Sequence, residues 1–322
     1  MGLIWYVPDR QFTHITKSRP NEPTLIVCNH PNSFFDALVL VAYHPGEMCF
    51  LTRGDLFRRP FLNWLLRALN MVPIYKRSDI DEADIRNAFT YDECVRHLKE
   101  GRQILIFPEG VSRNHKGLRP LMPRGTRALI DRAVDFDIPL QIQPYVIGYS
   151  SFDYVPKGIY LERLEKIDCT DFLENGTVRT HTILQTLKAR MEGAIPQESI
   201  TPSTRATETK SWTKKFAKAG EFTHRWLYQL LRNTIGKKTE GTIFYDSVMF
   251  TALIFIYPML VTLLSILIWI LVGFWYAVIV FTILPFLAYC WINSREIKIQ
   301  HDDLPDRLNH FQPENQLEKK GG

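Results

Sequence analysis

The sequence predicts an α/β fold with a mixed, partly parallel sheet flanked by helices, followed by a C-terminal transmembrane helical hairpin. Residues 1–195 alternate short apolar runs with amphipathic stretches, which is the pattern of strands and helices in an α/β domain. Residues 248–292 then run for about 45 positions without a charged side chain, whereas one bilayer crossing needs about 20 apolar residues. The long uncharged run therefore predicts two crossings.

The elements of the first part follow from local patterns. Helical periodicity is predicted for residues 84–100, which Gly101 ends, and for residues 125–136. The apolar runs that we expect to form strands are 25–28, 48–52, 71–75, 103–107 and 140–147. A chain of 322 residues with 46% hydrophobic residues has enough apolar surface for one large domain and an appendage.

The uncharged run has the features of a membrane hairpin. Gly273 lies near its middle, followed by the aromatic residues 274–276, where a hairpin tip is expected. Pro258 and Pro285 are expected to kink the two helices without excluding them. Basic residues flank both ends, so the positive-inside rule predicts an integral membrane protein whose preceding domain and both termini face the cytoplasm. The alternative is a hairpin buried in a protein core.

Residues 212–235 combine aromatic and leucine side chains with lysines and arginines at helical spacing, as in an interfacial amphipathic helix. The alternative is a helix packed on the preceding domain, and Gly220 marks a point where the helix is expected to break. The predicted boundaries are a first domain at 1–195, a linker at 196–211, an amphipathic segment at 212–240, the hairpin at 248–292 and a polar tail at 293–322.

Composition limits the classes of partner. The net charge of +5 suits anionic lipid, phosphorylated small molecules or nucleic acid, but no nucleic-acid-binding motif is present, so we expect no nucleic-acid partner. Five scattered cysteines form no Cys-x-x-Cys pattern, and no histidine pair has ligand spacing. The sequence therefore predicts no metal site and indicates a reducing compartment.

Chemistry-bearing residues follow several predicted strands. In open α/β sheets ligands gather at the carboxyl ends of strands. His30, Arg53, Arg77 and the pair Glu109 and Arg113 each come after an apolar run. One histidine, acidic groups and several arginines at one rim suit base catalysis on a phosphate-bearing substrate.

Asp36 has two interpretations. It lies six residues after His30 and is positioned to form a catalytic pair with it. Ser33 and Asp36 also fit the Ser-x-x-Asp pattern that caps a helix start. The two roles are compatible, because a carboxylate held at a helix start is well fixed for orienting a histidine.

Four blocks of the chain stand out: NHPNSFFD at 29–36, RGDLFRRP with IYKR within 53–77, FPEGVSR at 107–113 and IPLQIQPYV at 138–146. Together they resemble the glycerol-3-phosphate and lysophosphatidate acyltransferase superfamily. The resemblance covers roughly residues 20–150. It is closest to the glycerol-3-phosphate acyltransferase-like branch, because five residues separate His30 from Asp36 where most family members have four. The extra residue requires His30 to lie in the turn before the helix.

The resemblance implies a membrane-bound acyltransferase of phospholipid biosynthesis. A fatty acyl group would pass from acyl-CoA or acyl-carrier protein to a hydroxyl of glycerol-3-phosphate or lysophosphatidate, with the bilayer as a further partner and no other cofactor. His30 would be the general base and Asp36 its orienting group. The implied substrate-binding residues are Arg53, Arg77, Glu109, Gly110, Arg113 and Arg124.

Some roles in this set are less regular. Arg113 is displaced by one position from the family's usual arginine. Glu109 is anionic, so we expect it to orient an arginine or a glycerol hydroxyl rather than to bind phosphate. The acceptor stays open, because glycerol-3-phosphate, dihydroxyacetone phosphate and lysophosphatidate all carry a phosphate near a hydroxyl.

Two rival interpretations remain at this point. Cys28 could act as a nucleophile with His30 as its base, although a cysteine ending an apolar run is commonly a small buried residue. Alternatively, the chain could be a non-catalytic, membrane-associated lipid-binding protein that retains the fold.

Overall fold

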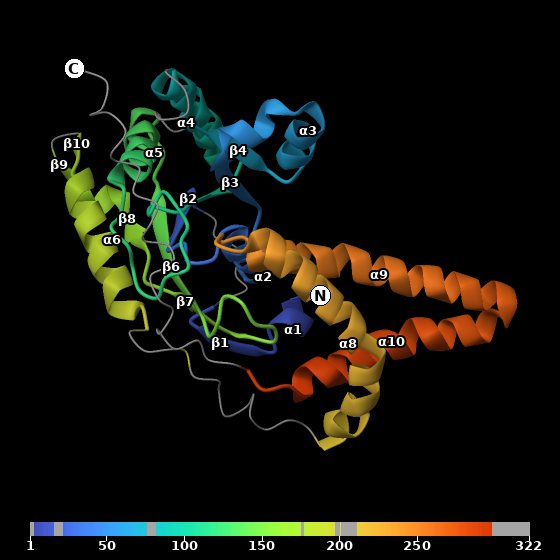
Figure 1. Cartoon of the computed structure of the whole chain (residues 1–322). Helices are drawn as coiled ribbons and strands as arrows, with labels where there is room; N and C mark the ends of the chain where they lie inside the picture. The colour runs from blue at the N-terminus through green and yellow to red at the C-terminus, as the bar shows by residue number, and fades with distance from the viewer. Residues whose placement is uncertain are drawn as a thin grey trace, which may run out of the picture.

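The structure is a computed structural model that describes residues 3–15, 22–75, 82–174, 177–196, 200 and 211–297. A layered α/β body carries two long helices that project from it side by side (Figure 1). Residues 298–322 of the predicted tail and nearly all of the predicted linker lie outside the described residues.

The body is built on an eight-stranded mixed sheet, which confirms the predicted fold class. Strands β2, β5, β3 and β4 pair in parallel, and β6 also runs parallel to β2, whereas β7 and β8 run antiparallel to β6. The order across the sheet is β1 (Asp9–Thr13), β7 (Gly158–Arg163), β6 (Gln141–Tyr149), β2 (Thr24–Cys28), β5 (Gln103–Ile106), β3 (Met48–Arg53) and β4 (Met71–Ile74), with β8 (Ile167–Asp168) beside β6.

Helices cover both faces of the sheet. Alternate residues of β2 point to opposite sides, with Ile26 in one buried cluster and Val27 in the other. One face packs on α4 (Ala83–Lys99), α5 (Pro123–Asp135) and α6 (Thr180–Ala194). The other face packs on α2 (Phe34–Tyr43), the short α1 (Leu3–Tyr6) and parts of the C-terminal helices.

Small elements complete the body. They are the 3₁₀ turns η1 (Gly54–Arg58) and η2 (Cys169–Phe172), the helix α3 (Pro60–Ala68) and a two-stranded ribbon of β9 (Leu173–Glu174) and β10 (Thr177–Val178).

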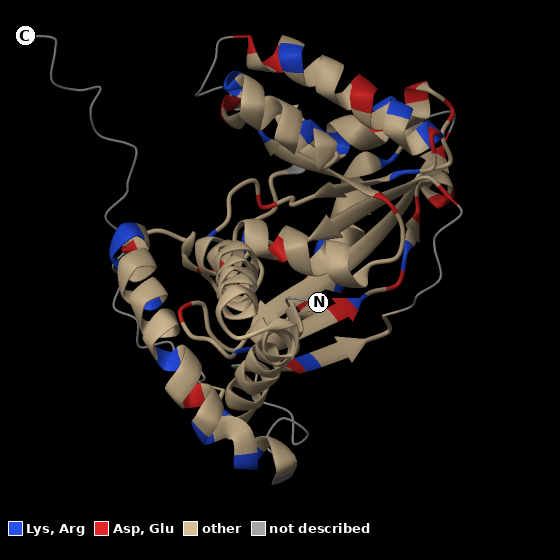
Figure 2. Cartoon of the chain, turned by 90° about the vertical axis from the view of Figure 1, so that its right-hand side faces the viewer, with Lys and Arg blue, Asp and Glu red and all other residues tan. Residues whose placement is uncertain are grey.

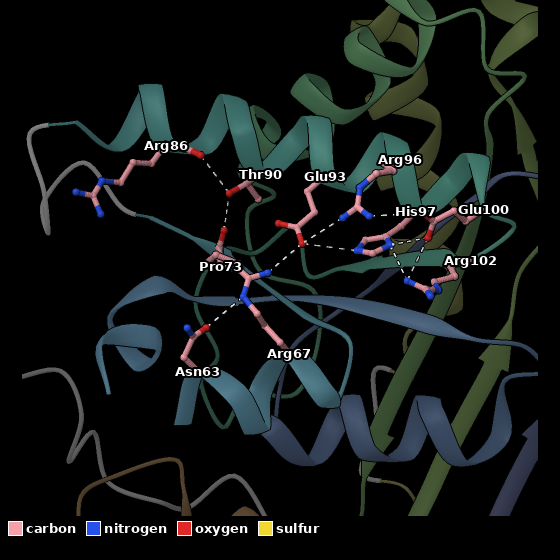
Figure 3. A network of polar contacts seen from close by, with 10 residues as sticks. All are labelled: Asn63, Arg67, Pro73, Arg86, Thr90, Glu93, Arg96, His97, Glu100 and Arg102. Carbon is pink, nitrogen blue, oxygen red and sulfur yellow. Dashed lines mark hydrogen bonds and ion pairs between the residues drawn. The ribbon is translucent and has the colours of Figure 1, made fainter. Parts of the chain in front are cut away.

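A polar network ties α3 to α4 and β4 (Figure 3): Arg67 pairs with Glu93 at 3.1 Å, and the Thr90 hydroxyl donates to the Pro73 carbonyl at 2.6 Å. This network fixes the outer strand whose carboxyl end lies beside that of β3.

The projecting helices are α9 (Tyr245–Leu271) and α10 (Phe274–Ser294), and both are long and apolar enough to cross a membrane. They meet at Gly273, whose φ of 127° is a conformation that glycine adopts readily. Pro258 and Pro285 lie inside the helices without ending them. Within the most apolar stretch of each helix, only 11% of α9 and 17% of α10 is buried. This low burial is contrary to the alternative of a buried core hairpin.

Helix α8 (Ser211–Thr239) spans the predicted amphipathic segment as one continuous helix. The prediction of a break at Gly220 is wrong, because this glycine lies where α8 crosses α10 at close range. A Cβ at Gly220 would lie 2.2 Å from the Leu287 carbonyl oxygen of α10, so the missing side chain lets the two helices approach. Trp212 also stacks on Phe286 of α10, with ring centroids 5.9 Å apart.

Candidate active site

His30 and Asp36 form a close pair at the carboxyl end of β2. The His30 Nδ1 and Asp36 Oδ2 atoms are 2.9 Å apart, the Asp36 side chain is fully buried and the His30 side chain is 18% exposed. With Nδ1 bonded to the carboxylate, Nε2 is the ring nitrogen available to a substrate. Within the described residues no hydrogen bond engages Nε2. The arrangement is that of a general base held by a carboxylate.

The turn between β2 and α2 places this pair. The side-chain amide of Asn29 exchanges two 2.8 Å hydrogen bonds with the backbone of Ile147 in β6, which anchors the start of the turn. Ser33 has a φ of 52°, and its backbone N–H donates to the Ser112 hydroxyl at 2.6 Å. Helix α2 begins at Phe34, so His30 lies before the helix and the turn accommodates the additional residue of this chain.

Capping by Ser33 does not occur in the form that the Ser-x-x-Asp pattern predicts. The Ser33 side chain makes no cap hydrogen bond. Asp36 instead accepts the backbone N–H of Asn32 at 2.8 Å through the same Oδ2 atom that faces His30. Asp36 therefore both stabilises the backbone of the turn and orients His30.

Asp36 has a third partner that sequence reasoning missed. The Tyr149 hydroxyl at the end of β6 donates to Asp36 Oδ1 at 2.7 Å. Burial raises the pKa of the Asp36 carboxyl, and the hydrogen bonds from His30, Tyr149 and the Asn32 amide oppose that rise. Because three donors favour its ionised form, the buried carboxylate is well prepared to accept the His30 N–H.

The turn after β5 forms the other wall of the site. The Phe107 ring stacks on the His30 imidazole, with centroids 3.9 Å apart and planes at 11°. Glu109 is buried, and burial raises its carboxyl pKa, whereas the backbone amides of Arg119 and His30 oppose that rise. The Glu109 carboxyl group thus accepts hydrogen bonds from backbone N–H groups and holds the two turns together. Gly110 adopts a φ of 70° beside Met122.

The arginines of the predicted rim are more exposed. Arg53 ends β3 and makes a two-point contact with Asp55, with 62% of its side chain exposed. Arg113 is exposed, and its backbone N–H donates to the His30 carbonyl at 3.4 Å. Arg124 is exposed in the first turn of α5. Arg77 lies outside the described residues.

Cys28 has the properties of a core residue. Its side chain is fully buried, and burial is the main cause that raises the thiol pKa well above its ordinary value. A nucleophilic cysteine needs an accessible, readily ionised thiol. The geometry therefore disfavours the cysteine-nucleophile alternative.

A buried polar cluster joins the site to the first turn of α9. The carboxylate of Asp246 accepts hydrogen bonds from the Tyr6 hydroxyl at 2.7 Å and the Asn32 side chain at 2.6 Å, and pairs with Lys157. Both Asp246 and Lys157 are fully buried. Asn32 thus links the hairpin to Asp36 through two of its atoms. The sequence signal for this cluster was Asp246 itself, a lone acid directly before the uncharged run.

Comparisons with known proteins find similarity to acyltransferases. The pattern of the Acyltransferase family matches residues 9–148. A 1-acyl-sn-glycerol-3-phosphate acyltransferase of Helicobacter pylori is 30% identical over 125 residues, which are 38% of this chain and 47% of that protein. A lyso-ornithine lipid O-acyltransferase of Pseudomonas aeruginosa is 28% identical over 135 residues, or 42% of this chain and 46% of that protein.

One solved structure is also similar. The 1-acyl-sn-glycerophosphate acyltransferase PlsC of Thermotoga maritima gives a TM-score of 0.42 at 18% identity, covering 59% of this chain and 74% of that chain. The chain spans a little under half the length of the curated relatives named above. The match to the Acyltransferase family lies within the α/β body.

Proposed function

We propose that the chain is a membrane-bound O-acyltransferase of phospholipid synthesis, which acylates a hydroxyl of glycerol-3-phosphate or lysophosphatidate. The observation that carries the proposal is the 2.9 Å pair of His30 and the buried Asp36 at the carboxyl end of β2. Relatives named as 1-acyl-sn-glycerol-3-phosphate acyltransferases support the acceptor class.

In the proposed reaction, His30 Nε2 takes the proton of the acceptor hydroxyl as its oxygen attacks the thioester carbonyl of acyl-CoA or acyl-carrier protein. Asp36 stabilises the imidazolium that forms. The tetrahedral intermediate collapses, the carbon–sulfur bond breaks, and the thiolate leaves with the proton that His30 returns. A thiol pKa near 8.5 makes this a far better leaving group than an alkoxide.

The arginines would bind the acceptor phosphate, since a planar guanidinium group matches phosphate geometry. Arg113 is the best placed of the described arginines, because its own backbone is bonded to that of His30. Arg53 would have to leave or share Asp55. Arg124 would add charge at the start of α5, and Arg77 stays a prediction from the sequence.

The apolar helices would hold this site at the cytoplasmic face of a membrane. Their exposed side chains include Phe255, Ile270 and Trp275, each more than 70% exposed. A long acyl chain is poorly soluble, so an active site near the bilayer surface receives the donor and releases the product into the leaflet.

The test is acyl transfer by the detergent-solubilised protein, offering glycerol-3-phosphate and lysophosphatidate side by side with long-chain acyl-CoA and, separately, acyl-carrier protein. Turnover on one acceptor that disappears in a folded His30→Ala variant supports the proposal and selects the acceptor. Absence of transfer to either acceptor by folded wild-type protein contradicts it and favours the lipid-binding alternative.

A further inference from the structure

A basic pocket lies between α8 and the last turn of α10. It is separate from the proposed catalytic turn, which is the segment 29–36 that holds His30 and Asp36. Its volume is about 430 Å³. Four of its lining side chains are cationic and one is anionic: Lys218, Arg225, Arg232, Arg295 and Glu221. Figure 2 shows basic residues spaced along α8, whereas the two projecting helices carry almost no charge beyond their ends.

Arg295 is the clearest sign that the pocket takes a ligand. Its guanidinium carbon lies 5.0 Å from the Tyr228 ring centroid and 5.3 Å from that of Trp291, so two aromatic rings hold the group in place. Its Nη1 atom is enclosed by protein and has no hydrogen-bond partner within the described part of the chain. A partly buried guanidinium group without an acidic partner is costly, and an anion bound in the pocket that Arg295 lines would offset its charge.

The protein neutralises little of the charge in this pocket. Glu221 is 3.0 Å from Arg225 and is committed to it. Arg232 lies over the Tyr154 ring and is close enough to Asp153 to influence that carboxyl. Among the described residues, no ion pair is found for Lys218 or Arg295. The pocket therefore keeps a net positive charge that is directed at whatever enters it.

The depth of the pocket indicates the kind of anion. Arg295 directly follows α10, so it lies at the end of the hairpin opposite Gly273. If α9 and α10 cross a bilayer, this end is at the height of the lipid headgroups on the side rich in basic residues. The phosphates at that height belong to membrane phospholipids.

We propose that this pocket binds the phosphate headgroup of an anionic phospholipid. The Arg295 guanidinium holds the phosphate, Arg232 and Lys218 add charge, and the lipid chains run along the apolar surfaces of α8 and α10. The proposal rests on the membrane placement of the hairpin and does not depend on acyl transfer.

The test is thermal unfolding of the full-length protein in detergent, because a ligand that binds the folded state raises Tm. The probes are dihexanoyl phosphatidylglycerol, dihexanoyl phosphatidylcholine and inorganic phosphate. We expect the anionic lipid to raise Tm more than the other two. Arg295→Gln is expected to weaken this response by about tenfold in lipid concentration, as for one charge-assisted hydrogen bond. Arg232→Gln should weaken it less.

Lys215→Gln is the matched control, since it removes an exposed charge from the same helix outside the pocket. It should respond as the wild-type protein does. An equal response of Arg295→Gln and the wild-type protein would overturn the proposal. An equal response to inorganic phosphate and to the anionic lipid would overturn the lipid as the ligand. Arg295→Lys keeps the charge, so a partly restored response would separate binding from a loss of folding.

Discussion

The catalytic turn and the arginine rim differ in how completely the protein itself satisfies their polar groups. Asp36 is fully buried and accepts three hydrogen bonds, and its histidine partner is stacked on Phe107. Arg53 is mostly exposed and paired with Asp55, and Arg113 is exposed as well.

This difference separates two tasks. Groups that transfer protons must be held in one geometry before the substrate arrives, because misplacement directly lowers the rate. Groups that bind a phosphate can remain hydrated until the anion arrives. Changes in the turn should therefore reduce kcat, whereas changes at the rim should mainly raise KM.

The largest expected effect is that of His30→Ala. Removing the proposed general base should lower kcat by about 10²–10⁴-fold with little change in Tm, since this side chain is partly exposed. Acyl transfer at saturating acceptor and thermal unfolding measure the two quantities. His181→Ala, an exposed histidine on α6, is the control and should keep full activity. A His30→Ala enzyme with near wild-type kcat would assign the chemistry to another group.

The next effect should come from the cluster at the start of α9. Replacing Lys157 alone would leave Asp246 charged and buried, at a cost of about 3–5 kcal/mol in unfolding free energy. The double variant Lys157→Met with Asp246→Leu removes both charges and should fold. It should lose up to about 10²-fold in kcat, because Asn32 loses the anchor that holds the turn.

Enzyme kinetics and Tm of the double variant test this link. A folded double variant with wild-type kcat would show that the cluster only stabilises the protein and does not position Asp36.

The pH dependence should separate activity from stability. Burial raises the pKa of Asp36, so this carboxyl becomes protonated at a higher pH in the folded protein than in the unfolded chain. Below that raised pKa, kcat/KM should fall by about tenfold per pH unit.

Stability should change with pH in the opposite direction to activity. Between the ordinary carboxyl pKa and the raised value the folded state binds more protons, so the contribution of Asp36 to stability increases as pH falls. Parallel profiles of kcat/KM and Tm test this. Comparison with Asp36→Asn isolates the group, and a Tm loss in the wild type that Asp36→Asn abolishes would contradict the raised pKa.

The smallest effects are expected at the rim. Arg113→Gln should raise the acceptor KM by about tenfold with kcat nearly unchanged, as for one lost charge-assisted hydrogen bond. Arg53→Gln should raise it less, because Asp55 already occupies that guanidinium group. Steady-state kinetics with varied acceptor distinguish the two. A fall in kcat for Arg113→Gln at unchanged KM would place this residue with the catalytic turn.

The sequence predicted the parts of the site that depend on local geometry. His30 and Asp36 lie within seven residues, and the apolar runs before them and before Glu109 indicated two strands that end at the same edge. The helices at 84–100 and 125–136 are confirmed within a few residues as α4 and α5. Such features depend on periodicity and turns, which neighbouring residues determine.

The missed contacts depend on how distant segments meet. Tyr149 reaches Asp36 only because β6 pairs with β2 in one register, and a shift by one residue would turn the hydroxyl to the other face. Asp246 reaches Asn32 only because α9 docks on α2. The sequence predicted a helix break at Gly220, because its own segment does not show that this glycine makes room for the backbone of α10.

The most direct test of the central claim is a double-mutant cycle on His30 and Asp36, with kcat for acyl transfer measured in the wild type, His30→Ala, Asp36→Asn and the double variant. If Asp36 acts through His30, the double variant should be no slower than His30→Ala alone. Fully additive losses in the two single variants would show that the residues act independently, and would contradict a preorganised catalytic pair.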